Sequence, residues 1–449
     1  MGTWILHPKA KLPAGTKILK NTWTFLIKRL PDGTIRKFKS RLAVRGDMQE
    51  QGTHYGGTYS ATVSWTSIRI LFILVIKHAL KSKQYDFVNV FVQAPLRPGE
   101  ELYMTLPSGY RDDLKGSHAC KLKKSLYGWK QGSVNWYLHL QEGLRQRGIR
   151  QSELDPGICF SPTLILITDE GNFETFLGVS VKQFEDKSIE LTQPQFIRKL
   201  LKVLDLGEVN PKPTPAVEVL SKDVEGEARR YQWNYRQAVG ILEYLKITTR
   251  PDITFAVSQV ARFSNNPKRS HGKALIRIAR YLKGTNDKGL VINPTTDSFF
   301  ECYCDAHFCG LWQVTDPEDP KSVHSRTGFV IVYAGVPIIW CSKLQTQIAF
   351  STVEAEYLAL SHSAREIIPT QELLQEIAQS FNFHIPRQSQ IHCDIYEDNN
   401  GALELATTPK IWPRTKHFGV CYHHFRNKLQ DGSLRVHPLV PILVCGLEN

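Results

Sequence analysis

The sequence has no hydrophobic run long enough to cross a membrane. The apolar stretch from Ile70 to Ile76 is bounded by Arg69 and Lys77, and its short length predicts a buried helix. The first residues, Met-Gly-Thr-Trp-Ile-Leu-His-Pro, also lack the long apolar core of a signal peptide. The sequence therefore predicts an intracellular protein, cytoplasmic or nuclear, with no membrane partner.

Cysteine motifs are missing as well. The chain has nine cysteines, but no two of them form a Cys-x-x-Cys pair, which argues against a structural zinc site. An odd number of cysteines without a signal peptide is typical of a reducing compartment.

Acidic residues are in deficit. Lysine and arginine number 56 against 43 acids, so the net charge is +13, which favours a polyanionic partner such as nucleic acid. The first fifty residues hold seven lysines and four arginines against three acids. Within them, the alternation from Arg36 to Arg41 would place cations along one side of a strand. The alternative interpretation is a solvated surface without a ligand.

A length of 449 residues suggests about three domains, and 42% hydrophobic with 22% charged residues indicates a folded protein. Hydrophobic spacing and turn residues predict the following elements. They are a β-hairpin over residues 22–46, a helix over 66–82, a strand over 85–92, a helix over 130–148, short strands over 156–190, a proline-rich linker over 210–215 and helices within 232–285.

The pattern changes near residue 298 and predicts a compact α/β domain. The expected order is strands over 299–304, 327–333 and 337–342, a helix over 353–379 and a strand over 391–396. Asp305 ends the first of these strands, Glu356 lies in the first turns of the helix, and Asp398 follows the last strand. If the three converge, their carboxylates should lie within about 6 Å of one another, close enough to share divalent metal ions. Glu354 is an alternative to Glu356.

Nine short segments occur in the order in which one protein family has them. They are RKFKSRLAVRG (36–46), YDFVNVFV (85–92), LYMTLPSGY (102–110), KSLYGWKQ (124–131), TRPDI (249–253), RYLKGT (280–285), STVEAEY (351–357), EDN (397–399) and RTKH (414–417). Together they resemble the reverse transcriptase–ribonuclease H portion of copia-type LTR-retrotransposon polyproteins, from about residue 20 to about residue 435.

The resemblance implies an α+β multidomain fold. Residues 20–190 would be the fingers and an incomplete palm of a polymerase, residues 191–297 a helical thumb or connection region, and residues 298–437 a ribonuclease H-like α/β domain. Residues 1–19 would then be an N-terminal extension, and residues 438–449 a tail outside the family.

The resemblance also implies roles for single residues. Asp86 matches the palm aspartate that binds Mg²⁺ or Mn²⁺, and Phe91 matches an aromatic gate that selects deoxynucleotides, although a core aromatic is the alternative. Lys39 and Arg41 match cations that hold the incoming deoxynucleoside triphosphate, and Gly128 lies in a turn beside the nascent base pair. The implied partners are RNA, DNA and RNA–DNA hybrids.

In the ribonuclease H-like part, Asp305, Glu356 and Asp398 match three catalytic acids that bind the metal ions. The family's fourth acid opens a last helix, and the tail after residue 437 has no such aspartate. We therefore expect at most weak ribonuclease H activity.

The palm departs from the family pattern. A Tyr-Val-Asp-Asp hairpin should follow the segment at 155–160, but several dozen family residues are missing near residues 161–170. Asp86 alone cannot hold two metal ions, so the polymerase is expected to be inactive, as in a degenerate or truncated copy. The alternatives are a non-catalytic nucleic-acid-binding remnant and a structural scaffold.

Overall fold

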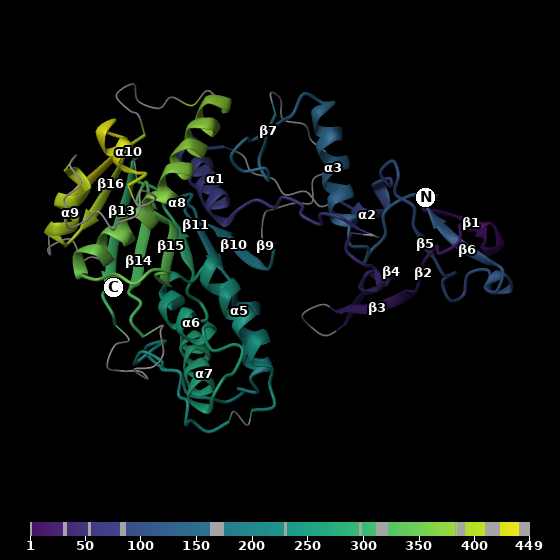
Figure 1. Cartoon of the computed structure of the whole chain (residues 1–449), viewed down its shortest axis with the longest axis horizontal. Coiled ribbons are helices and arrows are strands. Elements are labelled where there is room, and N and C mark those ends of the chain that lie inside the picture. Colours follow the sequence, from purple (N-terminus) through teal and green to yellow (C-terminus); the bar gives the residue numbers. More distant parts are fainter. Residues whose placement is uncertain are drawn as a thin grey trace. The chain divides into compact units, whose positions relative to one another are not determined.

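The computed structural model describes residues 2–29, 34–52, 55–80, 87–161, 175–228, 231–295, 299–310, 322–381, 383, 391–408 and 423–439. The fold is α+β, as predicted, and Figure 1 shows its helices and strands. The chain forms two compact units. Unit 1 comprises residues 1–63 and 84–170, and unit 2 comprises residues 64–83 and 171–449.

Unit 1 contains a four-stranded sheet in the order β1-β6-β5-β2. The strands are β1 (Trp4–Pro8), β6 (His118–Leu122), β5 (Tyr103–Met104) and β2 (Ile18–Leu19). Residues 1–19, expected to be an extension, thus supply two of its strands. The core beneath it includes Leu19, Met104 and Leu122, all at most 2% exposed.

The predicted β-hairpin is confirmed as β3 (Asn21–Arg29) and β4 (Ile35–Val44), which pair antiparallel. Thr24 lies opposite Arg41 and Leu26 opposite Lys39, so these two cations share one face, as the alternation predicted. The other face carries aromatic residues such as Phe25.

The strand predicted over 85–92 is wrong for its last residues, because residues 90–93 form the short helix α2 (Val90–Gln93). Asn89 precedes this helix with φ of 54°, a left-handed conformation that ends an extended chain. The aromatic and β-branched composition favoured a strand, but that preference depends on context.

The predicted helix over 130–148 is confirmed as α3 (Gly132–Arg145). The remaining short elements of unit 1 are β7 (Arg150–Gln151), β8 (Cys159–Phe160), η1 (Lys9–Lys11), η2 (Gly46–Met48) and η3 (Asp112–Leu114).

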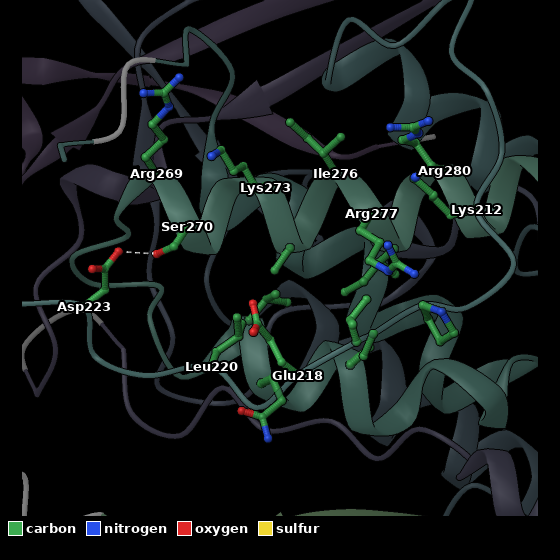
Figure 2. Close-up of a pocket in the computed structure, with 18 of the residues that line it drawn as sticks. Lys212, Glu218, Leu220, Asp223, Arg269, Ser270, Lys273, Ile276, Arg277 and Arg280 are labelled. Carbon is green, nitrogen blue, oxygen red and sulfur yellow. Dashed lines mark hydrogen bonds between the residues drawn. The ribbon is translucent and has the colours of Figure 1, made fainter. Parts of the chain in front are cut away.

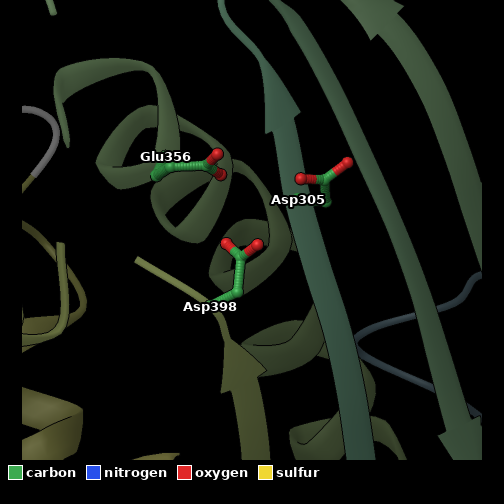
Figure 3. Close-up of side chains that lie close together, drawn as sticks. All are labelled: Asp305, Glu356 and Asp398. Atoms are coloured by element: carbon green, nitrogen blue, oxygen red, sulfur yellow. The ribbon is translucent and has the colours of Figure 1, made fainter. Parts of the chain in front are cut away.

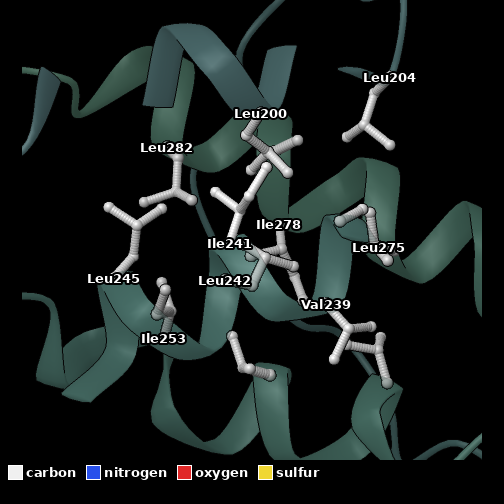
Figure 4. Close-up of a cluster of buried hydrophobic side chains, with 14 of the residues drawn as sticks. Leu200, Leu204, Val239, Ile241, Leu242, Leu245, Ile253, Leu275, Ile278 and Leu282 are labelled. Carbon is white, nitrogen blue, oxygen red and sulfur yellow. The ribbon is translucent and has the colours of Figure 1, made fainter. Parts of the chain in front are cut away.

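Unit 2 begins with an antiparallel sheet and a helical layer. The sheet has the order β12-β11-β10-β9, formed by β12 (Leu290–Ile292), β11 (Ile189–Thr192), β10 (Val179–Gln183) and β9 (Thr175–Phe176). The helices are α4 (Pro194–Val203), α5 (Tyr235–Thr248), α6 (Thr254–Ala261) and α7 (Arg269–Gly284), with η4 (Pro251–Ile253) before α6. Figure 4 shows their shared apolar core, in which Leu200, Leu242, Leu245 and Leu282 are fully buried. The helices predicted within 232–285 are confirmed.

Helix α1 (Trp65–Lys77), predicted over 66–82, packs within unit 2. The Arg69 guanidinium is buried, donates hydrogen bonds to the carbonyls of Ile338 (2.7 Å) and Thr248 (2.9 Å), and lies 4.0 Å from the Trp340 ring centroid. Burial lowers the pKa of Arg69 to about 9. Although the resemblance counts α1 with the polymerase part, its contacts tie it to α5 and to the last sheet.

The last sheet of unit 2 has five strands in the order β15-β14-β13-β16-β17. They are β13 (Phe300–His307), β14 (Arg326–Tyr333), β15 (Val336–Leu344), β16 (Cys393–Glu397) and β17 (Leu434–Pro438), with helices α8 (Thr352–Phe381), α9 (Asn400–Thr407) and α10 (Arg426–Gln430). The strands β13, β14 and β15 are antiparallel, whereas β16 runs parallel to both β13 and β17. Helix α8 packs on β13 and β14. This confirms the predicted α/β region from residue 298 onward.

In the part of the chain that the structure describes, no helix is both long enough and apolar enough to span a bilayer.

Candidate functional site

Three carboxylates converge at one edge of the five-stranded sheet. Asp305 lies near the end of β13, Glu356 in the first turns of α8, and Asp398 directly after β16. Because β13 and β16 are parallel neighbours, their carboxyl ends reach the same edge. One oxygen from each carboxylate lies within 4.8 Å of the other two, and Figure 3 shows the three groups facing one space. The predicted convergence within about 6 Å is confirmed.

The structure also separates the two candidate acids of α8. The Glu354 carboxylate accepts a hydrogen bond from the Phe350 N–H at 2.8 Å, so it caps the start of the helix. Glu356 lies half a turn further and faces Asp305 and Asp398. Of the two acids, Glu356 is therefore the one that faces the two aspartates.

The electrostatics of this cluster are unfavourable without a cation. Glu356 is buried, and burial together with the charges of Glu397, Asp305 and Asp398 raises its pKa to about 9. Burial, followed by the charge of Asp398, also raises the pKa of Asp305. The Oε2 atom of Glu356 is buried and has no hydrogen-bond partner among the described residues. Carboxylate oxygens are the ligands that Mg²⁺ and Mn²⁺ prefer, so the donor set fits a divalent cation.

Glu397 is a fourth acid beside the cluster that the sequence interpretation missed. It is fully buried, and burial raises its pKa to about 8 although the Asn399 N–H donates to its Oε1 atom at 3.2 Å. The burial of Glu397 could have been inferred from the alternation of β16, which places residue 397 on the same face as the buried Cys393 and Ile395.

The tail predicted to begin at residue 438 starts inside the sheet. Pro438 is the last residue of β17, and the Leu439 N–H donates to the Glu397 carbonyl at 2.8 Å. Residues 440–449 lie outside the described residues.

Several residues matched to the polymerase site gather in unit 1. The Arg41 guanidinium lies 5.4 Å from the Tyr127 ring centroid, and Phe91 contacts the same ring edge-on at 5.0 Å. Phe91 is half-buried and lies on α2. Gly128 follows Tyr127 with φ of 78°, and a Cβ atom there would lie 2.2 Å from the Val44 carbonyl oxygen. Only glycine fits this turn.

Lys39 and Asp86 are the two remaining residues matched to the polymerase site. Lys39 lies half-buried on β4, on the same face as Arg41. Asp86 and the position of the missing palm hairpin, near residues 162–170, lie outside the described residues.

A family model described as "Reverse transcriptase (RNA-dependent DNA polymerase)" matches residues 3–167. The match includes most of residues 1–19, so these residues are not an extension beyond the family region. Among solved structures, a foamy viral protease-reverse transcriptase in complex with double-stranded DNA is similar with a TM-score of 0.46 and 13% identity, covering 97% of this chain and 67% of that chain.

Retrotransposon polyproteins are similar over nearly the whole chain. The Retrovirus-related Pol polyprotein from transposon TNT 1-94 of Nicotiana tabacum is 30% identical over 468 aligned residues, which cover 95% of this chain and 34% of that protein. The polyprotein from transposon RE1 of Arabidopsis thaliana is 30% identical over 97% of this chain and 30% of its own length.

The chain thus spans about a third of the length of these relatives. The alignment with the tobacco protein is longer than the whole 449-residue chain, so the relative has residues without a counterpart here. These matches, with the motifs and the α+β fold, place the chain in the reverse transcriptase portion of copia-type retrotransposon Pol polyproteins.

Proposed function

We propose that this chain is a reverse transcriptase–ribonuclease H polypeptide that has kept weak ribonuclease H activity and lost polymerase activity. The observation that carries the proposal is the convergence of Asp305, Glu356 and Asp398 within 4.8 Å. In this proposal residues 20–190 correspond to the fingers and an incomplete palm, residues 191–297 to the thumb or connection, and residues 298–437 to the ribonuclease H-like domain.

The three acids would hold one or two divalent ions, Mg²⁺ or Mn²⁺. Bound ions would supply an activated water and neutralise charge on the scissile phosphate of the RNA strand. Asp305 and Asp398 are exposed and can face the substrate, whereas the buried Glu356 fixes the inner side of the site. Three carboxylates offer few ligands for two ions, so Mn²⁺ should support more activity than Mg²⁺ because its geometric demands are less strict.

Loss of polymerase activity is supported by the missing second pair of palm acids. Asp86 alone would leave the transferred phosphate without its metal clamp, and phosphoryl transfer depends on that charge neutralisation. The extra residues of the tobacco relative in the alignment agree with a deletion.

RNA, DNA and RNA–DNA hybrids are the proposed partners, with deoxynucleoside triphosphates implied by the family alone. Lys39 and Arg41 on one face of β4 would contact phosphate groups. If catalysis is absent altogether, this cationic face favours the second candidate function, a nucleic-acid-binding remnant.

The proposal is tested by cleavage of a hybrid labelled on its RNA strand. Wild-type protein should cleave with Mn²⁺, and Asp398→Asn should reduce the rate on the order of 100-fold because a metal ligand is lost. The matched control is Asp394→Asn on the same strand, since Asp394 instead bonds to His437 at 2.8 Å and should tolerate the change. Cleavage that survives Asp398→Asn would mean that the active site lies elsewhere.

The polymerase half of the proposal is tested by primer extension on an RNA template. We expect no incorporation of deoxynucleotides with Mg²⁺ or Mn²⁺, and therefore no difference between wild type and Asp86→Asn. Incorporation that Asp86→Asn abolishes would show an intact polymerase site and contradict the proposal.

A further inference from the structure

A cleft with a volume of about 670 Å³ lies in the helical layer of unit 2, away from the acid cluster. Its walls are the segment 212–227, which has no helix or strand, and helices α6 and α7. The size is that of a small-molecule site, and its lining mixes apolar side chains with charged ones.

Three cations gather toward one end of this cleft. They are Lys212, Arg277 and Arg280, which Figure 2 shows close together at the end of α7. Arg277 and Arg280 are three residues apart on α7, so they share one side of the helix. Lys273, one turn earlier on α7, lies nearer to Arg269. Within the described residues, none of Lys212, Arg277 and Arg280 makes a salt bridge to an acid.

The two arginines are held in place without being neutralised. Arg277 donates to the Thr214 hydroxyl at 2.8 Å, and Arg280 donates from Nε to the Asn210 carbonyl at 2.6 Å. Each guanidinium has five N–H donors, so most of them are left for a ligand. The Nε of Arg277 is buried and has no partner among the described residues. Both side chains are therefore pre-oriented donors around a positive, unpaired end of the cleft.

The other end of the cleft carries acids that already have partners. Asp223 accepts a hydrogen bond from the Ser270 hydroxyl, and Glu227 pairs with Arg269 at 2.5 Å. Between the two ends the lining is mainly aliphatic, with Ala216, Leu220, Ala256, Val260 and Ile278, but it also includes the acid Glu218 beside Leu220. An anionic group therefore suits the first end, and an apolar or flat organic group suits the middle.

We infer that this cleft binds a phosphate ester, with the phosphate on Lys212, Arg277 and Arg280 and the organic part of the ester against Leu220 and Val260. Several N–H donors around one point match the three oxygens and double charge of a phosphate better than a single carboxylate. The ester can come from a free nucleotide or from the backbone of a nucleic-acid strand. The site does not depend on the proposed ribonuclease H activity, because it shares no residue with the acid cluster.

The test is acetylation footprinting of the full chain by mass spectrometry, with three probes: pyrophosphate, deoxyadenosine monophosphate and an oligodeoxythymidine strand. A bound phosphate should slow acetylation of Lys212 several-fold, while the exposed Lys187 in the turn between β10 and β11 serves as the internal reference. Protection by the mononucleotide identifies a nucleotide site, and protection by the strand alone identifies a backbone contact. Either result supports the inference.

Variants make the test specific. The double variant Arg277→Gln, Arg280→Gln should bind the protecting probe about tenfold more weakly, because two charge-assisted hydrogen-bond donors are lost. The double variant Arg277→Lys, Arg280→Lys keeps the charge, and its affinity for the probe should lie between that of the first variant and that of the wild type. The matched control is Arg236→Gln on α5, since Arg236 also donates from Nε to a backbone carbonyl, that of Ser264 at 3.1 Å, but lies outside the cleft.

Three results would overturn the inference. They are no protection by any probe, equal protection by polyglutamate, and equal weakening by Arg236→Gln. Comparison of the melting curves of all variants excludes unfolding as the cause. The outcome is separate from that of the cleavage assay, since none of these variants alters Asp305, Glu356 or Asp398.

Discussion

The β3–β4 hairpin of unit 1 and the acid cluster of unit 2 both concentrate charge of one sign, but they do so in different surroundings. Lys39 and Arg41 of β4 lie half-buried on one face of a two-stranded sheet whose opposite face is open to solvent, with Phe25 75% and Phe38 71% exposed. In the cluster, Glu356 is only 6% exposed, in the first turns of a thirty-residue helix.

This difference in burial predicts which solution variable controls each region. Charges that reach solvent are screened within about 8 Å at physiological ionic strength, so the half-buried cations of the hairpin should respond to salt. Buried acids are screened far less and keep their repulsion, so the cluster should respond to pH and to divalent cations. The same kind of charge concentration therefore leads to two different experimental signatures.

The largest expected effect is the loss of the backbone contact that anchors the hairpin. Gly128→Ala should lower the free energy of unfolding of unit 1 by about 3 kcal/mol, because the added Cβ collides with the Val44 carbonyl and φ stays positive. This change in the free energy of unfolding is measured by urea denaturation, with hydrogen exchange of the β4 amides as the readout.

The matched control for this change is Gly109→Ala, also in unit 1. Gly109 has φ of 82° but open space around its Cβ position, so its replacement should cost only about 1 kcal/mol. Equal effects of the two substitutions would show that backbone strain alone, and not the contact with Val44, stabilises the turn.

The second effect concerns the pH dependence of the acid cluster. Glu356 has a pKa of about 9 in the fold, above its value in the unfolded chain, so its contribution is fully present below about pH 4 and is lost as the pH rises toward 9. Glu356→Gln should therefore stabilise the metal-free protein at pH 8 by roughly 2 kcal/mol and have little effect at pH 4. Chemical denaturation in EDTA at both pH values measures the difference.

Glu354→Gln is the control for this variant, because Glu354 is equally buried but caps α8 through the Phe350 N–H. Loss of the Glu354 carboxylate should destabilise the protein at pH 8. A divalent cation should stabilise the wild type and act much less on Glu356→Gln. If Glu356→Gln lowers stability at pH 8, the repulsion among the carboxylates has been overestimated.

The acid cluster could be predicted from sequence because each part has a local signal. Asp305 and Asp398 each lie near the end of a predicted strand, and Glu354 and Glu356 lie at the start of the predicted helix. The choice between Glu354 and Glu356 stayed open until the structure showed which one faces the two aspartates. The order of strands and helix then brought them to one edge. Glu397 was missed because a buried acid at the end of a strand looks like a turn residue until the packing of α8 over it is known.

Unit 1 was less predictable, for a physical reason. Residues 85–92 have strand composition, yet α2 follows the left-handed Asn89, a conformation that composition does not encode. The contacts of Arg69 also join elements far apart in sequence, α1 with α5 and β15, so no local pattern could assign α1 to unit 2. The hairpin itself had clear turn chemistry and was predicted.

The smallest expected effect is on the salt dependence of nucleic-acid binding. If the face of β4 that carries Lys39 and Arg41 contacts phosphates, Lys39→Gln with Arg41→Gln should reduce the slope of log affinity against log salt by about 1 to 2, since each contact releases about one counterion. Fluorescence anisotropy with a labelled hybrid over a range of salt concentrations measures the slope. Lys9→Gln with Lys11→Gln removes the same charge from η1 of the same unit and is the matched control. An equal change in slope for both pairs of substitutions would mean that net charge alone attracts the nucleic acid. Lys39 and Arg41 would then lie on a solvated face that makes no specific contact.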